Sequence, residues 1–224
     1  MKFYVLLADI MGSSRHRDRA ALTDSMQSAV EHINERHQAD LFAPLEITRG
    51  DEMAAVFTSI HGLYSALSEL ERNLHPVRFR SVVVYDELTA GLDSGRAGVM
   101  DGPAFYRARE RMTLLKRSRT TFALSSGQKD LNEPAEVLVN LLQWRWSEMT
   151  KLQREIVRLY QVERNQLKVA EALGRSQQQI SHSLIATKWE LIDQSEVAIR
   201  HLLELVDRNN GTIGGAMEGK RVSA

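Results

Sequence analysis

Two aspartates in the first quarter of the chain have the side chains and the spacing that divalent-metal chemistry needs. Asp9 directly follows a short apolar run, and Asp51 follows Gly50 at the expected tip of a hairpin. Two carboxylates on neighbouring strand ends repel each other unless a cation lies between them, and hard oxygen ligands favour Mg²⁺ or Mn²⁺. The expected metal contacts are Asp9, Ile10 and Asp51. Taken singly, each aspartate is equally consistent with an ordinary turn or helix cap.

Glycines, hydroxyl-bearing residues and arginines surround these two aspartates or follow them along the chain. A metal with open coordination positions favours phosphate oxygens, and arginine binds phosphate through paired hydrogen bonds. The sequence therefore predicts a pocket for a metal and a nucleotide, although the arginines could also form a solvated surface. The expected nucleotide contacts are Gly12, Ser13, Ser14, Arg15, Arg49, Gly50, Glu52, Arg107 and Arg109.

A second group of residues, between Lys168 and Leu184, has the pattern of a helix-turn-helix. Gly174 stands where a left-handed C-cap residue is needed, and Ser176 stands at the N-cap of the following helix. Such a pair of helices can bind DNA, because glutamine recognises adenine and basic side chains contact phosphate. The expected DNA contacts are Arg175, Ser176, Gln177, Gln178, Gln179, Ser181, His182 and Lys188. A helical hairpin that only packs, or that binds a protein, is the alternative.

The elements that must position the aspartates follow from an alternation of short apolar runs and amphipathic runs. Strands are expected at 3–8, 41–48, 52–57, 77–85 and 120–124, and helices at 19–37, after residue 57 up to Pro76, and at 105–115. This order is the ferredoxin-like split βαβ pattern, which predicts one sheet with helices on one face. It would place Asp9 beside the hairpin tip that carries Asp51.

After Gly127 the strand signal disappears, and helices are expected at 134–146, 151–160, 166–173 and 177–192. The predicted fold class is therefore α+β, with a ferredoxin-like domain over 1–126 and an all-α helix-turn-helix domain over 133–208. The glycine-rich residues 209–224 are expected to be a disordered tail that folding does not need.

Composition excludes several classes of protein. The 224 residues include no cysteine, which excludes a disulfide scaffold and a thiolate metal site. The 29 basic and 29 acidic residues give a formal net charge of zero, so affinity for DNA must come from a local patch. No apolar run approaches the ~20 residues that span a bilayer. A cytoplasmic protein without a membrane segment is expected.

The segment from Thr150 to Leu184 resembles the last region of bacterial sigma factors and the related response-regulator domains. The matching residues are Gln153, Arg154, Glu155, Leu159, Tyr160, Val169, Ala170, Leu173, Gly174, Ser176, Ile180, Ser181 and Leu184. The resemblance implies binding to double-stranded DNA. It also implies a homodimer, because helix-turn-helix proteins usually recognise two half-sites.

Residues 3–124 resemble class III nucleotidyl cyclases and their diguanylate-cyclase relatives. The matching stretches are Asp9–Gly12, Gly50–Glu52 and Asp101–Arg109. Tyr106 and Glu110 stand where those enzymes carry an asparagine and an arginine that stabilise the triphosphate and ribose. The resemblance implies a cyclase-like palm that binds a nucleotide together with a divalent metal.

The whole chain resembles the SatD family of bacterial proteins, whose members are usually described as regulators. The matching stretches are Ala8–Arg19, Arg49–Met53 and Asp101–Glu110, followed by the helix-turn-helix. We therefore expect a DNA-binding transcriptional regulator whose palm senses a nucleotide. One alternative is an enzyme that cyclises or joins nucleotides, with the helical domain for targeting. Another is a palm that serves only as a dimerisation scaffold.

Overall fold

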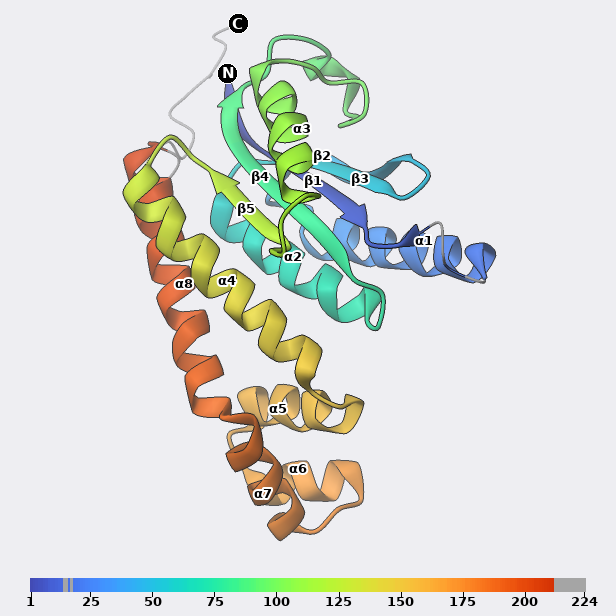
Figure 1. Cartoon of the computed structure of the whole chain (residues 1–224), viewed down its shortest axis with the longest axis vertical. Coiled ribbons are helices and arrows are strands. Elements are labelled where there is room, and N and C mark those ends of the chain that lie inside the picture. The colour runs from blue at the N-terminus through green and yellow to red at the C-terminus, as the bar shows by residue number, and fades with distance from the viewer. Residues whose placement is uncertain (14–15, 17, 212–224) are drawn as a thin grey trace, which may run out of the picture. The chain divides into compact units, whose positions relative to one another are not determined.

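The computed structural model describes residues 1–13, 16 and 18–211 (Figure 1). The chain forms two compact units. The first, called the palm below, comprises the described residues of 1–136 together with residues 202–211, and the second, called the helical unit, comprises residues 137–201. The palm is therefore discontinuous in sequence, whereas the sequence analysis divides the chain into consecutive domains.

The palm is built on a mixed sheet of five strands in the order β2-β3-β1-β4-β5. The strands are β1 Lys2–Ile10, β2 Leu41–Arg49, β3 Glu52–Phe57, β4 Phe79–Glu87 and β5 Phe122–Ser125. Neighbouring strands are antiparallel, except that β5 runs parallel to β4. The expected α+β class and the split βαβ pattern are confirmed, with β1 between β3 and β4 at the centre of the sheet.

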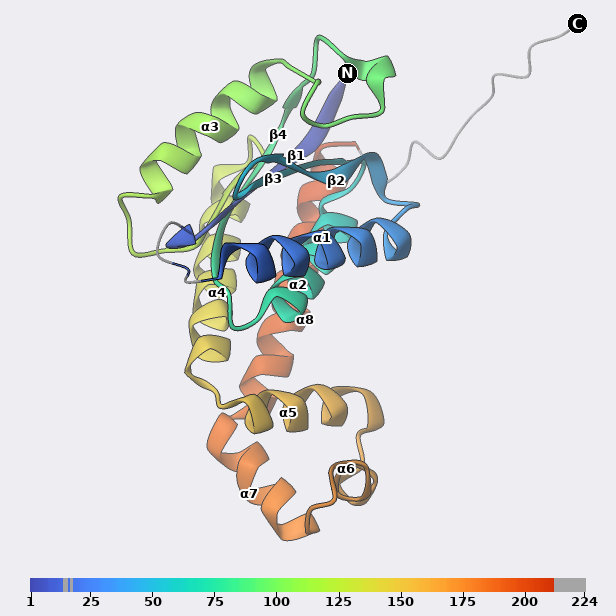
Figure 2. The same cartoon turned by 90° about the vertical axis from the view of Figure 1, so that its right-hand side faces the viewer.

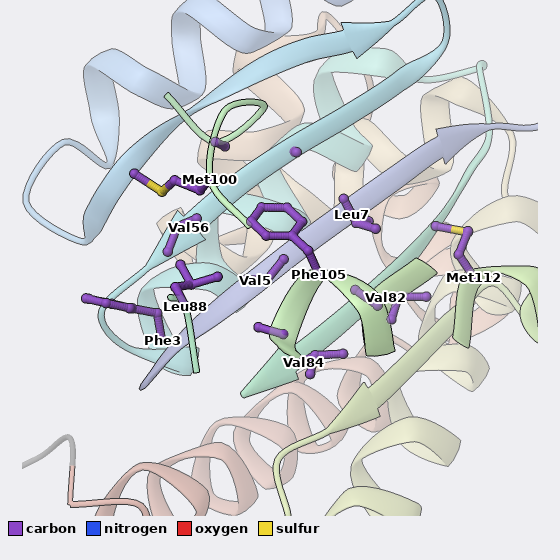
Figure 3. Close-up of a cluster of buried hydrophobic side chains, with 14 of the residues drawn as sticks. Phe3, Val5, Leu7, Val56, Val82, Val84, Leu88, Met100, Phe105 and Met112 are labelled. Carbon is purple, nitrogen blue, oxygen red and sulfur yellow. The ribbon is translucent and has the colours of Figure 1, made fainter. Parts of the chain in front are cut away.

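Three helices and one 3₁₀ turn belong to the loops and crossovers of this sheet. They are α1 Arg19–Arg36, α2 Ile60–Leu74, η2 Leu92–Ser94 and α3 Pro103–Leu115. The side chains of Val5 and Leu7 on β1 pack under α3 together with Val82 and Val84 of β4, and Phe3 lies beside Leu88 in the same cluster (Figure 3). Helices α1 and α2 lie on the opposite face of the sheet from α3 (Figure 2).

The expectation that all helices cover one face is therefore wrong. The reason lies in the strands, because β1 is buried at every position from Phe3 to Ile10 instead of at alternate positions. A strand that is apolar throughout needs cover on both faces. Helix α3 supplies the second layer, through buried residues such as Phe105 and Met112.

The C-terminal end of the chain completes the palm through a cluster of polar contacts, called the clasp below. The carboxylate of Asp207, which is fully buried, accepts hydrogen bonds from the backbone amides of Ile60 at 3.1 Å and His61 at 3.4 Å. Asn210 donates to the Tyr4 hydroxyl at 3.0 Å, and its carbonyl accepts from the Tyr85 hydroxyl at 3.2 Å. Burial, followed by the charge of Asp207, raises the pKa of Tyr85.

The clasp corrects the expected tail. Asn209 and Asn210 are anchored to Gln128 by side-chain hydrogen bonds of 2.7 Å and 2.8 Å, so these two residues are part of the palm. The rest of the predicted tail, residues 212–224, lies outside the described residues.

The helical unit contains five helices in whole or in part, namely α4 Lys129–Glu148, α5 Lys151–Glu163, α6 Gln166–Leu173, α7 Gln177–Thr187 and α8 Trp189–Asn209. The single helix expected at 177–192 is wrong, because Lys188 adopts a left-handed conformation (φ 55°) that ends α7 and separates it from α8. Across the described residues, no helix combines the length and apolar character that a bilayer span requires.

The clasp makes a testable prediction about stability. Asp207→Ala should lower the free energy of unfolding by about 2–3 kcal/mol, because two buried amides lose a charged acceptor. Asp207→Asn should cost less, since an amide oxygen still accepts one of these bonds. Urea denaturation of the full chain measures both changes.

Two truncations provide the control. Ending the chain after Gly211 keeps the clasp and should leave the unfolding midpoint unchanged, whereas ending it after His201 removes Asp207 and Asn210 and should destabilise the palm. Equal midpoints for the two truncated chains would contradict the role of the clasp.

Candidate functional site

Asp9 lies near the end of the central strand β1 and is 7% exposed. Its Oδ1 atom lies 2.6 Å from the Nζ atom of Lys116, which follows directly after α3. The residues paired with Asp9 on the two neighbouring strands are Glu52 and Arg80. Directly paired residues point to the same face of a sheet, so a second carboxylate and a guanidinium share the face that carries Asp9. Lys116 provides Asp9 with a positive charge from within the chain, and the sequence analysis missed it.

Asp51 lies at the tip of the β2–β3 hairpin, as expected. Its Oδ2 atom accepts a short hydrogen bond from the Ser13 hydroxyl, and its carbonyl accepts one from the amide of Ile10 at 3.1 Å. The tip turns through Gly50 at φ 58°, a conformation that favours glycine. The structure thus brings the loop after β1 and the hairpin tip together, which is the juxtaposition that the topology predicts.

The two aspartates are therefore both engaged by other residues of the chain. Among the residues that the structure describes, no group of three or more histidine, aspartate or glutamate side chains could hold a metal ion. Lys116 occupies the position of a cation beside Asp9, so a metal there would have to displace it or bind the other oxygen. A Mg²⁺ or Mn²⁺ ion held by Asp9, Ile10 and Asp51 stays a prediction.

A polar cavity of about 160 Å³ lies on the α3 side of the sheet, beside β2 and β3. Three of the predicted nucleotide contacts line it, namely Arg49, Glu52 and Arg109, and so do Leu7 and Phe105, which Figure 3 shows in the core under α3. The Arg109 guanidinium lies 5.6 Å from the centre of the Phe105 ring. The cavity is therefore lined by both apolar and charged residues.

Two further charged residues of this cavity had no signal in the sequence. Glu46 accepts a hydrogen bond from Arg96 Nε at 3.3 Å and a short one from the amide of Gly98. A Cβ atom at Gly98 would lie 2.9 Å from Glu46 Oε1, so a larger residue here would require the Glu46 side chain to move. The cavity thus has three guanidinium groups, from Arg49, Arg96 and Arg109, against the two carboxylates of Glu46 and Glu52.

Other predicted contacts lie outside this cavity. Arg107 Nη1 lies 2.7 Å from Asp86 Oδ2 on β4, so its guanidinium is directed to another part of the sheet. Burial alone would raise the pKa of Asp86, but the hydrogen bond from Arg107 and its charge outweigh burial and lower that pKa. Gly12 and Ser13 lie by the hairpin tip with Asp51, whereas Ser14 and Arg15 are outside the described residues.

Helices α5, α6 and α7 form the compact core of the helical unit (Figure 1). Its buried side chains are Ile156 and Val157 of α5, Val169 and Ala170 of α6, and Ile180 and Leu184 of α7. Gly174 ends α6 in the left-handed conformation at φ 59°. Ser176 then begins α7 with a capping box, in which its side chain and that of Gln179 each accept a backbone hydrogen bond from the other residue.

The contacts of α7 separate the predicted DNA-binding residues into two groups. Gln179 and Ser176 are used by the capping box, Gln177 donates to Gln166 at 3.2 Å, and Ser181 is half-buried. The remaining predicted contacts are Arg175, Gln178, His182 and Lys188, all of which are exposed, as are Ser176, Gln177 and Gln179. Arg175 precedes the helix and Lys188 ends it, so two basic side chains flank its exposed polar surface.

The fold and these sites define an α+β protein in which a ferredoxin-like palm is joined to a helix-turn-helix unit. The chain belongs to the SatD family, whose family model matches residues 3–200. No curated protein matches the chain.

Solved structures show weaker likenesses. A bacterial light-regulated adenylyl cyclase is 14% identical, with a TM-score of 0.43, over 56% of this chain and 76% of its own. A second structure of such a cyclase is 13% identical, with a TM-score of 0.44, over 58% of this chain and 44% of its own. A regulator of polyketide synthase expression from Bifidobacterium adolescentis is 11% identical, with a TM-score of 0.25, over 94% of this chain and 82% of its own.

The ion pair of Asp9 makes a prediction that also tests the metal hypothesis. Lys116→Met should lower the free energy of unfolding at neutral pH by about 1–2 kcal/mol, because a buried carboxylate loses its partner. The loss is smaller than for a fully buried pair, since the Lys116 side chain is 45% exposed. Adding Asp9→Asn to this variant should recover most of the loss.

Melting curves with and without Mn²⁺ complete this test. If Asp9 and Asp51 can hold a metal, Mn²⁺ should restore the stability of Lys116→Met and should fail to do so when Asp51→Asn is added. Lys129→Met, which removes an exposed lysine, is the control. A melting temperature that Mn²⁺ leaves unchanged in every variant would show that the metal prediction is wrong.

Proposed function

We propose that this chain is a DNA-binding transcriptional regulator whose palm senses an anionic nucleotide. The observation that carries the proposal is the surface of α7. This helix contains no charged residue, and the sequence from residue 172 to residue 189 contains no acidic one. Arg175 and Lys188 lie exposed at its two ends. A polar helix without carboxylates, flanked by two bases, suits the negative potential of a DNA groove.

The way α7 is held supports this proposal. Its inner face is fixed by Ile180 and Leu184, and its first turn is fixed by the capping box of Ser176 and Gln179. The cap thus satisfies backbone groups in the first turn, and recognition helices make most of their base contacts with their N-terminal residues. The remaining exposed side chains of α7 can contact a partner outside the unit.

DNA binding is tested by its dependence on salt. The full chain should bind a pool of random-sequence duplexes, with an affinity that falls as salt concentration rises. Arg175→Gln should weaken binding to all sequences alike and reduce the slope of log K against log salt by about one. Fluorescence anisotropy at several salt concentrations measures both values.

Lys129→Gln is the matched control, because it removes one exposed positive charge from the palm segment of α4. This variant should keep the slope of the natural protein. The proposal fails if the natural protein binds no duplex, or if Arg175→Gln and Lys129→Gln change the slope equally.

The nucleotide part of the proposal rests on the palm cavity. Its volume of about 160 Å³ is well below the ~300–1,000 Å³ of pockets that enclose a whole small molecule. Arg49, Arg96 and Arg109 carry the donors that bind phosphate. We therefore assign the cavity to the phosphate groups of a nucleotide, with the remainder of the ligand outside it.

Isothermal titration with ATP, GTP and pyrophosphate tests this assignment. Arg49→Gln and Arg109→Gln should each weaken binding about tenfold, because a hydrogen bond between charged groups contributes roughly 1.5–3 kcal/mol. Arg119→Gln, which removes an exposed arginine beyond α3, should have no effect. If none of the three ligands binds, or if Arg119→Gln matters as much as the other two changes, the cavity is not a phosphate site.

The two activities would be coupled in the proposed regulator. A nucleotide that binds one arrangement of the protein better than another changes its affinity for DNA, and DNA then changes its affinity for the nucleotide by the same factor. We include a homodimer in the proposal, since two copies of the recognition helix would contact two half-sites. Turnover of a nucleoside triphosphate would instead favour the enzymatic alternative. The hydroxyl of Tyr106, which stands where cyclases carry a catalytic side chain, donates to Asp101 at 2.7 Å, so it is already engaged within the palm.

A further inference from the structure

Only some of the residues of α7 lie on its outer face, opposite the core of the helical unit. The buried residues Ile180, Leu184 and Thr187 define its inner face. At about 100° of rotation per residue, the residues directly opposite this inner face are Gln178, His182 and Ile185. These three follow the i, i+4, i+7 spacing of a single stripe, and all of them are exposed. Any partner that approaches α7 from outside therefore meets this stripe first.

Ile185 is the unexpected member of the stripe. Its side chain is apolar, yet it lies on the face that points away from the core of the unit and is 66% exposed. The next residue, Ala186, is apolar as well. The stripe thus combines an amide, an imidazole and a branched apolar side chain, without any formal charge when the histidine is neutral.

This combination matches the chemistry of one kind of base pair. In the major groove an A·T pair presents the N7 and N6 positions of adenine, which glutamine contacts in a bidentate way, and the methyl group of thymine, which apolar side chains contact. A G·C pair is instead recognised most often by arginine or lysine, and the stripe contains neither. Arg175 and Lys188, at the ends of the helix, are suited to phosphates.

We propose that the stripe of Gln178, His182 and Ile185 selects A·T base pairs in the major groove of double-stranded DNA. In this arrangement Ile185 packs against a thymine methyl group and Gln178 pairs with an adenine. The inference rests on the proposed DNA-binding function and adds the base preference to it. Ile185 becomes a residue that determines specificity, and the sequence analysis did not include it among the DNA contacts.

The test begins with duplexes that the full chain selects from a random-sequence pool. Each thymine of a selected duplex is then replaced, one at a time, by deoxyuridine, which lacks the methyl group and keeps the base pairing. At one thymine in each half-site the natural protein should lose about three- to fivefold in affinity, the value of one buried methyl group. Ile185→Ala should bind the thymine and deoxyuridine duplexes equally well.

Leu191→Ala is the matched control, because it truncates a side chain of the same size that is 61% exposed on α8, outside the stripe. This variant should keep the preference for thymine. Since Ile185 is exposed, its replacement should leave the melting temperature unchanged, which separates a lost contact from a lost fold. A parallel replacement of adenine by 7-deazaadenine should weaken the natural protein and leave Gln178→Ala unaffected.

Three outcomes would overturn the inference. Selected duplexes without a shared A·T position would do so, as would binding that is insensitive to deoxyuridine at every thymine. Ile185→Ala that still prefers thymine would do so as well. In each of these cases the protein still binds DNA, so the proposed function survives. A failure to select any duplex would instead overturn both the function and the base preference.

Discussion

The palm depends on one buried charge, the carboxylate of Asp207. A helix begins with backbone amides that have no partner within the helix. In α2 the first two of these amides, from Ile60 and His61, donate to Asp207, and the third, from Gly62, donates to the Ser59 hydroxyl at 3.0 Å. The charge in turn is stabilised by the positive end of the helix dipole. The carboxylate or the amides would each be costly to bury alone, and the hydrogen bonds between them join the C-terminal end of α8 to the start of α2.

The sheet of the palm is covered by helices on both faces. Helices α1 and α2 cover one face of the sheet, and α3 covers the other, so β1 lies in a core that is closed on both sides. The polar cavity lies on the α3 side, where residues of β2 and β3 line it together with residues 96–99. Buried apolar strands thus fix the sheet, and the charged residues of the cavity lie beside the apolar core under α3.

Local signals in the sequence predicted local features well. The capping residues Ser176 and Thr150 and the left-handed Gly174 each act within one turn of helix, and all three lie where the pattern expects them. Long-range pairs could not be found in this way. Asp207 lies 147 residues from Ile60, and Lys116 lies 107 residues from Asp9. Neither pair leaves any trace in spacing or composition, because each depends on how distant elements pack.

Two features that differ from the prediction do have signals in the sequence. The run from Phe3 to Ala8 is apolar at consecutive positions, which is typical of a strand covered on both faces. Lys188 is a second case, because a cationic residue at a helix end interacts favourably with the last carbonyls. In the structure α7 ends at this residue, although the apolar spacing continues beyond it. The cavity residues Glu46 and Arg96 had no comparable signal, because they lie 50 residues apart in different loops and strands.

The discontinuity of the palm has a consequence for how the protein is made. The ribosome delivers the five strands and helices α1 to α3 first, then residues 137–201, and only then the segment that carries Asp207 and Asn210. Until this last segment emerges, the amides at the start of α2 and the hydroxyls of Tyr4 and Tyr85 lack the partners that they have in the finished fold. The palm therefore matures after the helical unit has been synthesised. A chain that stops before residue 202 therefore lacks the contacts that complete the palm.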